Sequence, residues 1–149
     1  MHSRTLPGRL LPALLAAVAL QLLSAGPAMA ADRPLAARSV EVLRGTVKPV
    51  AHRASGQASV VATGRRRTLN LRSFRIAPGP RVRVYLVPRG ARTDGAIPRD
   101  FKDIGALKGS RGNQRYEIPA SVDLRRYTSV VFWCVPFTQS LARADLRRA

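Results

Sequence analysis

The sequence predicts an all-β fold, a single antiparallel β-sandwich or barrel-like domain, for most of this 149-residue chain. Short segments in which apolar and polar residues alternate recur roughly every ten residues, and turn-forming Gly and Pro residues separate them. Beyond residue 30, no long segment has the 3.6-residue period of an amphipathic helix. The hydrophobic fraction of 46% is sufficient for a packed core, which excludes a disordered polyelectrolyte.

The N-terminal segment differs in composition from the rest of the chain. Arg4 and Arg9 make a basic start, residues 10–23 form an apolar run, and Ala28-Met29-Ala30 supplies small residues for a cleavage site. The apolar run is shorter than the about 20 residues that a membrane span needs. We therefore expect residues 1–30 to be a secretory signal peptide, with an uncleaved anchor as the alternative. Export places the protein in the periplasm or outside the cell.

Cleavage after residue 30 would leave two parts. We expect residues 31–42 to be a short N-terminal lead and residues 43–147 to form the β domain, without a transmembrane segment. The β-branched stretch at residues 40–47 predicts the first strand and crosses that boundary. No internal repeat or linker divides the remainder, so the sequence predicts one domain.

The sequence of the first half of the domain predicts three further strands. Residues 56–62 contain adjacent valines, and residues 64–67 have the composition of a hairpin tip. Residues 68–72 alternate strictly, which predicts that their leucines face inward. After the Pro- and Gly-rich breaker at residues 77–80, residues 81–86 alternate equally clearly, with Val and Leu on one face and Arg and Tyr on the other.

The second half is less regular. Residues 88–98 read as a second breaker, residues 101–107 are ambiguous, and residues 114–118 predict a short strand. Residues 128–135 are the most apolar stretch after the signal peptide, which indicates a strand that is buried on both faces. Residues 137–146 fit either a final strand or a short helix, and the surrounding all-β pattern favours the strand.

Several motifs carry a family resemblance. Leu107-Lys108-Gly109 precedes a Gln-x-Tyr-x-Ile-Pro run at residues 114–119, Pro80 precedes a Val-Tyr-Leu strand, and Trp133-Cys134 lies in the apolar stretch. Over about residues 43–147 the chain resembles the DM-thirteen domain, also called the electron-transfer DM domain. The resemblance implies an extracytoplasmic β fold that works beside cytochrome-like DOMON domains, with the cysteine passing electrons.

The chain departs from the family pattern at two positions. Arg81 stands where the family usually has Asp after the Pro, and Leu141 stands where it often has Phe. The first difference removes an acidic group, so any function of that group in the family does not carry over to this chain.

Cys134 is the candidate redox group. It is the only cysteine, so the chain can form neither an intramolecular disulfide nor a Cys-rich zinc site. A single thiol can still react through a sulfenic acid or a mixed disulfide, with His52 and Trp133 as possible supporting residues. The alternative is a buried small hydrophobe, which the apolar neighbours at residues 130–135 favour. The sequence leaves both open, and it also permits a dimer linked through this thiol.

The residues available beyond position 30 argue against an intrinsic cofactor. They include one histidine, His52, and no methionine, whereas a blue-copper site needs two His, one Cys and usually an axial Met. A CxxCH haem motif is absent, and no GxSxG or HExxH motif indicates an enzyme. We therefore expect no intrinsic metal or haem. A cytochrome-like redox partner would hold any cofactor, and the sequence does not say whether that cofactor is haem.

Basic residues dominate the surface chemistry. The chain has 26 Lys plus Arg against 8 Asp plus Glu, a formal net charge of +18. Arg65, Arg66 and Arg67 form the only basic triple and are candidates for binding anionic lipid, glycan or protein at the cell envelope. Nucleic acid is not expected, because the chain has an export signal and no recognition motif. A non-catalytic binding module is thus the alternative to a redox module, and a merely solvated arginine-rich surface is the plainest interpretation.

Overall fold

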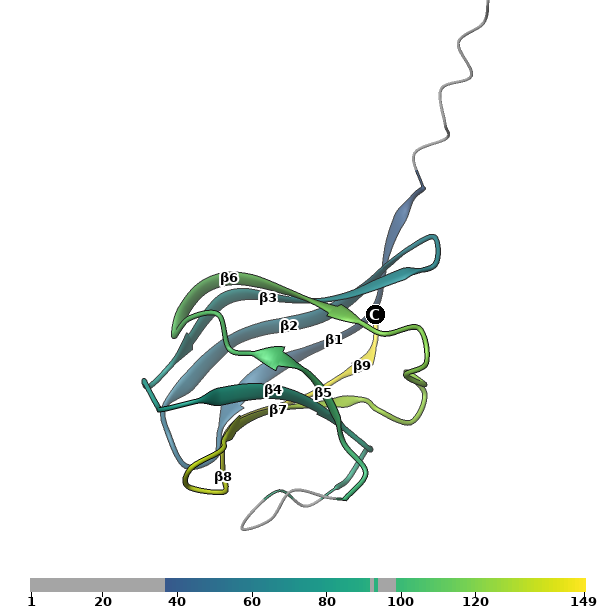
Figure 1. The fold of residues 1–149 in the computed structure, drawn as a ribbon. Coiled ribbons are helices and arrows are strands. Elements are labelled where there is room, and N and C mark those ends of the chain that lie inside the picture. The colour runs from purple at the N-terminus through teal and green to yellow at the C-terminus, as the bar shows by residue number, and fades with distance from the viewer. Residues whose placement is uncertain (1–36, 92, 94–98) are drawn as a thin grey trace, which may run out of the picture. The chain divides into compact units, whose positions relative to one another are not determined.

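The computed structural model describes residues 37–91, 93 and 99–149 (Figure 1). The expected signal peptide and residues 31–36 of the expected lead lie outside these residues. All regular elements of the described residues are strands, so the predicted all-β class is confirmed. The strands are β1 (Ser39–Pro49), β2 (Ala54–Thr63), β3 (Arg66–Ile76), β4 (Val82–Val87), β5 (Lys102–Ala106), β6 (Arg111–Ile118), β7 (Ser129–Cys134), β8 (Gln139–Asp145) and β9 (Arg147–Arg148).

The strands form one antiparallel sheet that curls until it is nearly a closed barrel (Figure 1). The order is β5-β4-β7-β8-β1-β2-β3-β6, and β9 pairs with β1. The long strand β1 joins the two halves, because residues 39–46 pair with β2 and residues 47–49 pair with β8. At the seam between β5 and β6, the backbone N–H of Lys108 donates to the hydroxyl of Tyr116 over 3.0 Å.

Alternating side chains from the strands fill the barrel. Leu69 and Leu71 of β3 are buried, as their alternation predicts. The rings of Phe74 and Phe132 meet with their centroids 4.8 Å apart and bring β3 and β7 together across the interior. Burial of such apolar side chains is the main stabilising contribution to a domain of this size.

A second apolar cluster lies outside the barrel, on the other face of β4 and β7. It contains Tyr85, Val87, Val131 and Trp133, and the ring of Phe101 lies 4.5 Å from that of Tyr85. Strand β7 is therefore buried on both faces, as predicted. Tyr85 lies on the face that was expected to be polar and is nevertheless buried, because the chain around Phe101 packs over it.

Several boundaries differ from the sequence-based expectation. Strand β1 begins at Ser39, inside the predicted lead, and β6 begins at Arg111, ahead of the predicted start at residue 114. The hairpin tip is confined to Gly64 and Arg65, since β3 begins at Arg66. The ambiguous residues 101–107 contain β5.

The last segment of the domain is strand and not helix. Residues 137–146 contain β8, which pairs with β7 on one side and with β1 on the other, and this pairing overrides the helical propensity of its alanines. Part of the breaker predicted at residues 88–98 lies outside the described residues. No helix in the described part of the chain has the length and apolar character of a membrane span.

Candidate functional site

Cys134 lies at the last position of β7, near one end of the barrel. It pairs with Val82 of β4 and Gln139 of β8, and its side chain faces inward on the same face as Phe132. Only 1% of the residue is exposed. The Sγ–H group donates to the carbonyl oxygen of Pro80 over 3.3 Å. The thiol is thus a packed core group with one polar contact.

The connection between β3 and β4 covers the sulfur. Pro78, Gly79, Pro80 and Arg81 of this connection are all exposed, although the Pro80 carbonyl points inward to the thiol. A Cβ atom on Gly79 would lie 3.2 Å from Leu141 Cδ1, so the connection lies close against the core. One exposed residue of the connecting segment, Pro80, therefore accepts the only hydrogen bond that the Cys134 side chain makes within the described residues.

Arg81 holds the end of this connection in an unusual backbone conformation. Its φ is +43°, in the left-handed region that non-glycine residues seldom adopt, and its carbonyl accepts a hydrogen bond of 3.3 Å from the N–H of Val135. The tight turn places Val82 directly beside Cys134. Such a conformation persists only where the surrounding structure holds it, here through the pairing of β4 with β7.

His52 does not join Cys134. It is exposed in the turn between β1 and β2, where its backbone N–H donates to the Leu141 carbonyl over 3.2 Å. The N–H groups of Val50 and Ala51 donate to the same carbonyl. In the part of the chain that the structure describes, the imidazole makes no hydrogen bond. His52 therefore has the features expected of a histidine with a structural role, because it lies in a turn whose backbone is hydrogen-bonded to the Leu141 carbonyl.

Trp133 lies on the opposite side of β7 from Cys134. It is 5% exposed and packs in the outer cluster with Tyr85 and Val131. Because successive residues of a strand point to opposite faces, adjacency in sequence separates these two side chains. The three residues considered for redox chemistry, Cys134, His52 and Trp133, therefore do not form one site.

The basic triple does not act as a unit. Arg65 and Arg66 are exposed at and beside the hairpin turn. The Arg67 guanidinium donates to the carbonyl oxygens of Pro119 over 2.7 Å and Val122 over 2.8 Å. Arg67 thus fastens the connection between β6 and β7 through its guanidinium donors, whereas Arg65 and Arg66 are exposed.

The comparisons with known proteins bear on the whole barrel. A family model described as Electron transfer DM13 matches residues 46–146. The chain belongs to the DM13 family. The match begins within β1 and ends directly after β8, so the DM13 domain includes the sulfur, its cover and the outer cluster. No curated protein and no solved structure matches the chain.

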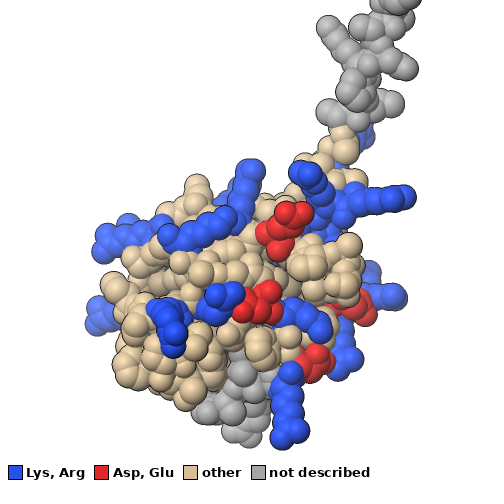
Figure 2. Space-filling view, in the orientation of Figure 1, with Lys and Arg blue, Asp and Glu red and all other residues tan. Residues whose placement is uncertain are grey.

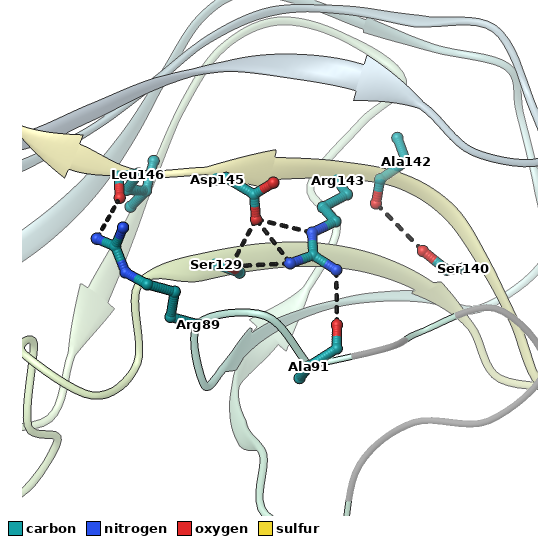
Figure 3. Close-up of polar contacts among 8 residues, drawn as sticks. All are labelled: Arg89, Ala91, Ser129, Ser140, Ala142, Arg143, Asp145 and Leu146. Carbon is teal, nitrogen blue, oxygen red and sulfur yellow. Dashed lines mark hydrogen bonds and ion pairs between the residues drawn. The ribbon is translucent and has the colours of Figure 1, made fainter.

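A polar network that the sequence patterns did not indicate lies on the outer face of this DM13 domain (Figure 3). Arg143 donates through Nε to Asp145 over 2.8 Å and through a terminal nitrogen to the carbonyl of Ala91 over 2.6 Å. Ser129 donates to the same Asp145 oxygen over 2.6 Å. Residues 143 and 145 share a strand face, so the strand favoured for residues 137–146 could have indicated the pair.

The network affects the charge of Asp145. Burial works against the charged form, but the hydrogen bonds from Ser129 and Arg143 outweigh it, so the pKa of Asp145 lies below its ordinary value. The nearby Arg89 also donates, over 3.5 Å, to the carbonyl of Leu146. These contacts attach the first residues after β4 to strand β8 and to Leu146, which follows that strand.

The other end of that segment is attached through Asp100. Its carboxylate accepts hydrogen bonds from the Tyr127 hydroxyl and from Arg126, and Lys102 lies 3.9 Å away. The hydrogen bond from Tyr127 lowers the pKa of Asp100 most, and Arg126 and Lys102 lower it further against the opposing effect of desolvation. The segment is thus anchored on both sides of the outer cluster of the DM13 domain.

Metal-ligating side chains are not gathered in the described ranges. Among residues 37–91, 93 and 99–149, no group of three or more His, Cys, Asp or Glu side chains is close enough to hold a metal ion.

Proposed function

We propose that this chain is an exported electron-transfer accessory module in which Cys134 is the redox-active group. The family match supports an electron-transfer role for the domain as a whole. The observation that carries the cysteine assignment is the hydrogen bond from Sγ to Pro80, a residue of an exposed connection. Displacing that connection opens the sulfur without unpairing β7, which is a local opening of lower cost than global unfolding.

The proposed reaction is thiol–disulfide exchange with a partner protein that carries a disulfide. Cys134 loses its proton to water, and the thiolate attacks one sulfur of the partner's disulfide. A new S–S bond joins Cys134 to the partner as the partner's own S–S bond breaks. The second partner sulfur leaves as a thiolate and takes a proton from water. Cys134 is oxidised and the released partner sulfur is reduced, so atoms and electrons balance.

The second redox centre belongs to the partner in this proposal. Beyond residue 30 the chain has a single cysteine, a single histidine and no methionine, so its own set of sulfur and imidazole ligands is small. A lone thiol can exchange with a partner but cannot store its oxidised state as an internal disulfide. This limitation is consistent with an accessory module and not with a self-contained carrier.

Export follows from residues 1–30, whose basic start, apolar run and small-residue site are those of a signal peptide. The expected processed chain begins at Ala31. Mass spectrometry of the protein collected outside the cytoplasm tests this proposal. A chain that retains residues 1–30 and stays with the membrane would support the uncleaved anchor instead.

The decisive experiment measures how fast Cys134 reacts with an aromatic disulfide that releases a coloured thiolate. We expect the folded protein to react faster than its global unfolding rate allows. Replacing Pro80 with Gly loosens the connection that covers the sulfur. The P80G variant should therefore react faster than its population of globally unfolded molecules can account for. Cys134→Ser is the matched control and should release no colour. Reaction at the global unfolding rate in both the wild-type and P80G proteins would refute the redox role of Cys134.

A further inference from the structure

The outer face of β3 and β6 carries an unusual concentration of positive charge. Arg72, Arg75, Arg111 and Arg115 all lie exposed on these two strands, and Arg75 is the direct cross-strand partner of Arg111. Figure 2 shows basic side chains gathered over this part of the domain, at the upper left. Like charges directly opposite each other destabilise a sheet, so this arrangement is unfavourable without an anionic partner.

Little negative charge offsets these arginines. Glu117 is the only acid in the two strands, and it pairs with Thr68 in the register. Among the described residues, no ion pair involves any of the four arginines, whereas Arg83, Arg126 and Arg143 each pair with an aspartate elsewhere. The face therefore presents more guanidinium groups than carboxylates, and guanidinium groups suit acidic partners in a bidentate geometry.

The same face is hollowed. One depression of about 400 Å³ is lined by Asn70, Arg72, Asn113 and Arg115, among others. A neighbouring one of about 350 Å³ shares Asn70, Arg72 and Arg115 and extends to Ser39 of β1. Because the two depressions share three residues, they form one trough across β6, β3, β2 and β1.

The trough combines charged donors with a neutral one. Asn113 is exposed, and its Oδ1 accepts from the Ser73 N–H over 3.0 Å, which leaves its amide NH₂ group directed to other partners. That amide donates to a neutral oxygen such as a hydroxyl, whereas a ligand for Arg72 and Arg115 must carry negative charge.

We propose that this trough binds a linear acidic polysaccharide. Its carboxylate groups would pair with Arg72 and Arg115, and a sugar hydroxyl oxygen would accept from the Asn113 amide. At the other end of the trough, Thr68 and Glu41 offer neutral and acceptor groups that suit further hydroxyls. The alternation of acidic and hydroxyl groups along a uronic acid polymer matches this sequence of partners.

The observations favour a polysaccharide over a lipid surface. A membrane-binding face usually adds apolar side chains that enter the headgroup region. The large exposed hydrophobic residues of the described chain are Val40, Val50 and Phe137, and none of them lines the trough. The inference is independent of the redox chemistry of Cys134, which lies inside the barrel.

Calorimetric titration of the folded chain with alginate, a linear polymer of uronic acids, tests the proposal. We expect binding to alginate and none to neutral dextran at the same salt concentration. The double variant R72Q/R115Q should bind at least about tenfold more weakly, a loss of about 1.4 kcal/mol or more, because it removes two charged donors. The matched control R147Q/R148Q removes the same charge from two exposed arginines outside the trough and should change affinity by less than about twofold.

A third variant separates a shaped site from general attraction. Asn113→Ala leaves the net charge unchanged and should weaken alginate binding by several-fold, because it removes the amide donor. Equal losses in the two double variants would overturn the proposal in favour of net charge alone. Tighter binding of polyglutamate or of phosphatidylglycerol vesicles through the same arginines would overturn it in favour of a protein or lipid partner. Circular dichroism confirms that each variant is folded.

Discussion

Replacing Arg143 with Met should detach the segment after β4 from the barrel. The lost hydrogen bond to the Ala91 carbonyl has a charged donor, and such bonds contribute about 1.5–3 kcal/mol. The ion pair with Asp145 adds at most about 1 kcal/mol, because the Asp145 side chain is 60% exposed. Methionine retains part of the packing of the arginine stem. We expect the free energy of unfolding to fall by about 2–3 kcal/mol.

Urea unfolding monitored by the fluorescence of Trp133, the only tryptophan, measures this change. Asp145→Asn is the control, because it removes the ion pair and leaves the bond to Ala91, and it should cost about 1 kcal/mol or less. Hydrogen exchange at the Ala91 amide should accelerate in R143M only. A loss below about 0.5 kcal/mol in R143M, with unchanged exchange at Ala91, would refute the reasoning, since ordinary surface substitutions fall in that range.

Three further predictions address packing and pH. Gly45→Ala would place a Cβ atom 2.3 Å from the Asp145 carbonyl oxygen and should cost about 1–3 kcal/mol in urea unfolding; an unchanged midpoint would contradict this close approach. Phe132→Ala should cost about 3–5 kcal/mol, because the ring is fully buried; a loss below about 1 kcal/mol would show that the interior is not packed as described. The lowered pKa of Asp145 stabilises the fold above the unfolded carboxyl value of about 3.9, and this contribution disappears as the pH falls through the lower folded value. Unfolding measured from pH 6 to pH 2 should therefore show a shallower acid decline in D145N than in the wild type, and identical profiles would contradict the assignment.

Local patterns predicted most of the sheet correctly. The alternation at Leu69 and Leu71 and the continuous apolar run of β7 are signals carried by adjacent residues, and both strands lie where they were expected. The segment that contains β8 was ambiguous, because its alanines favour helix while its position favours strand. Pairing with β7 and β1 decides between the two, and that pairing involves residues distant in the sequence.

The candidate site depended more strongly on distant contacts. Apolar neighbours of Cys134 indicated burial but could not reveal its cover, because the Pro80 carbonyl lies 54 residues earlier in the chain. The basic triple looks uniform in sequence, yet Arg67 is engaged by carbonyls that lie 52 and 55 residues away. Conversely, nothing in the sequence links Arg72 with Arg115, because they become neighbours only when β3 pairs with β6.

The amino-acid sequence determines the strand class, the excess of arginine and the single cysteine of this DM13 chain, since these depend on composition and on a side-chain period of two residues. Closure of the sheet decides the rest: that Cys134 is covered, that Trp133 faces away from it, and that the outer arginines of β3 and β6 lie together. The physical reason is that strand neighbours in a barrel are set by hydrogen bonds and packing between segments far apart in sequence. No local pattern specifies which backbone carbonyl will meet a given thiol or guanidinium group.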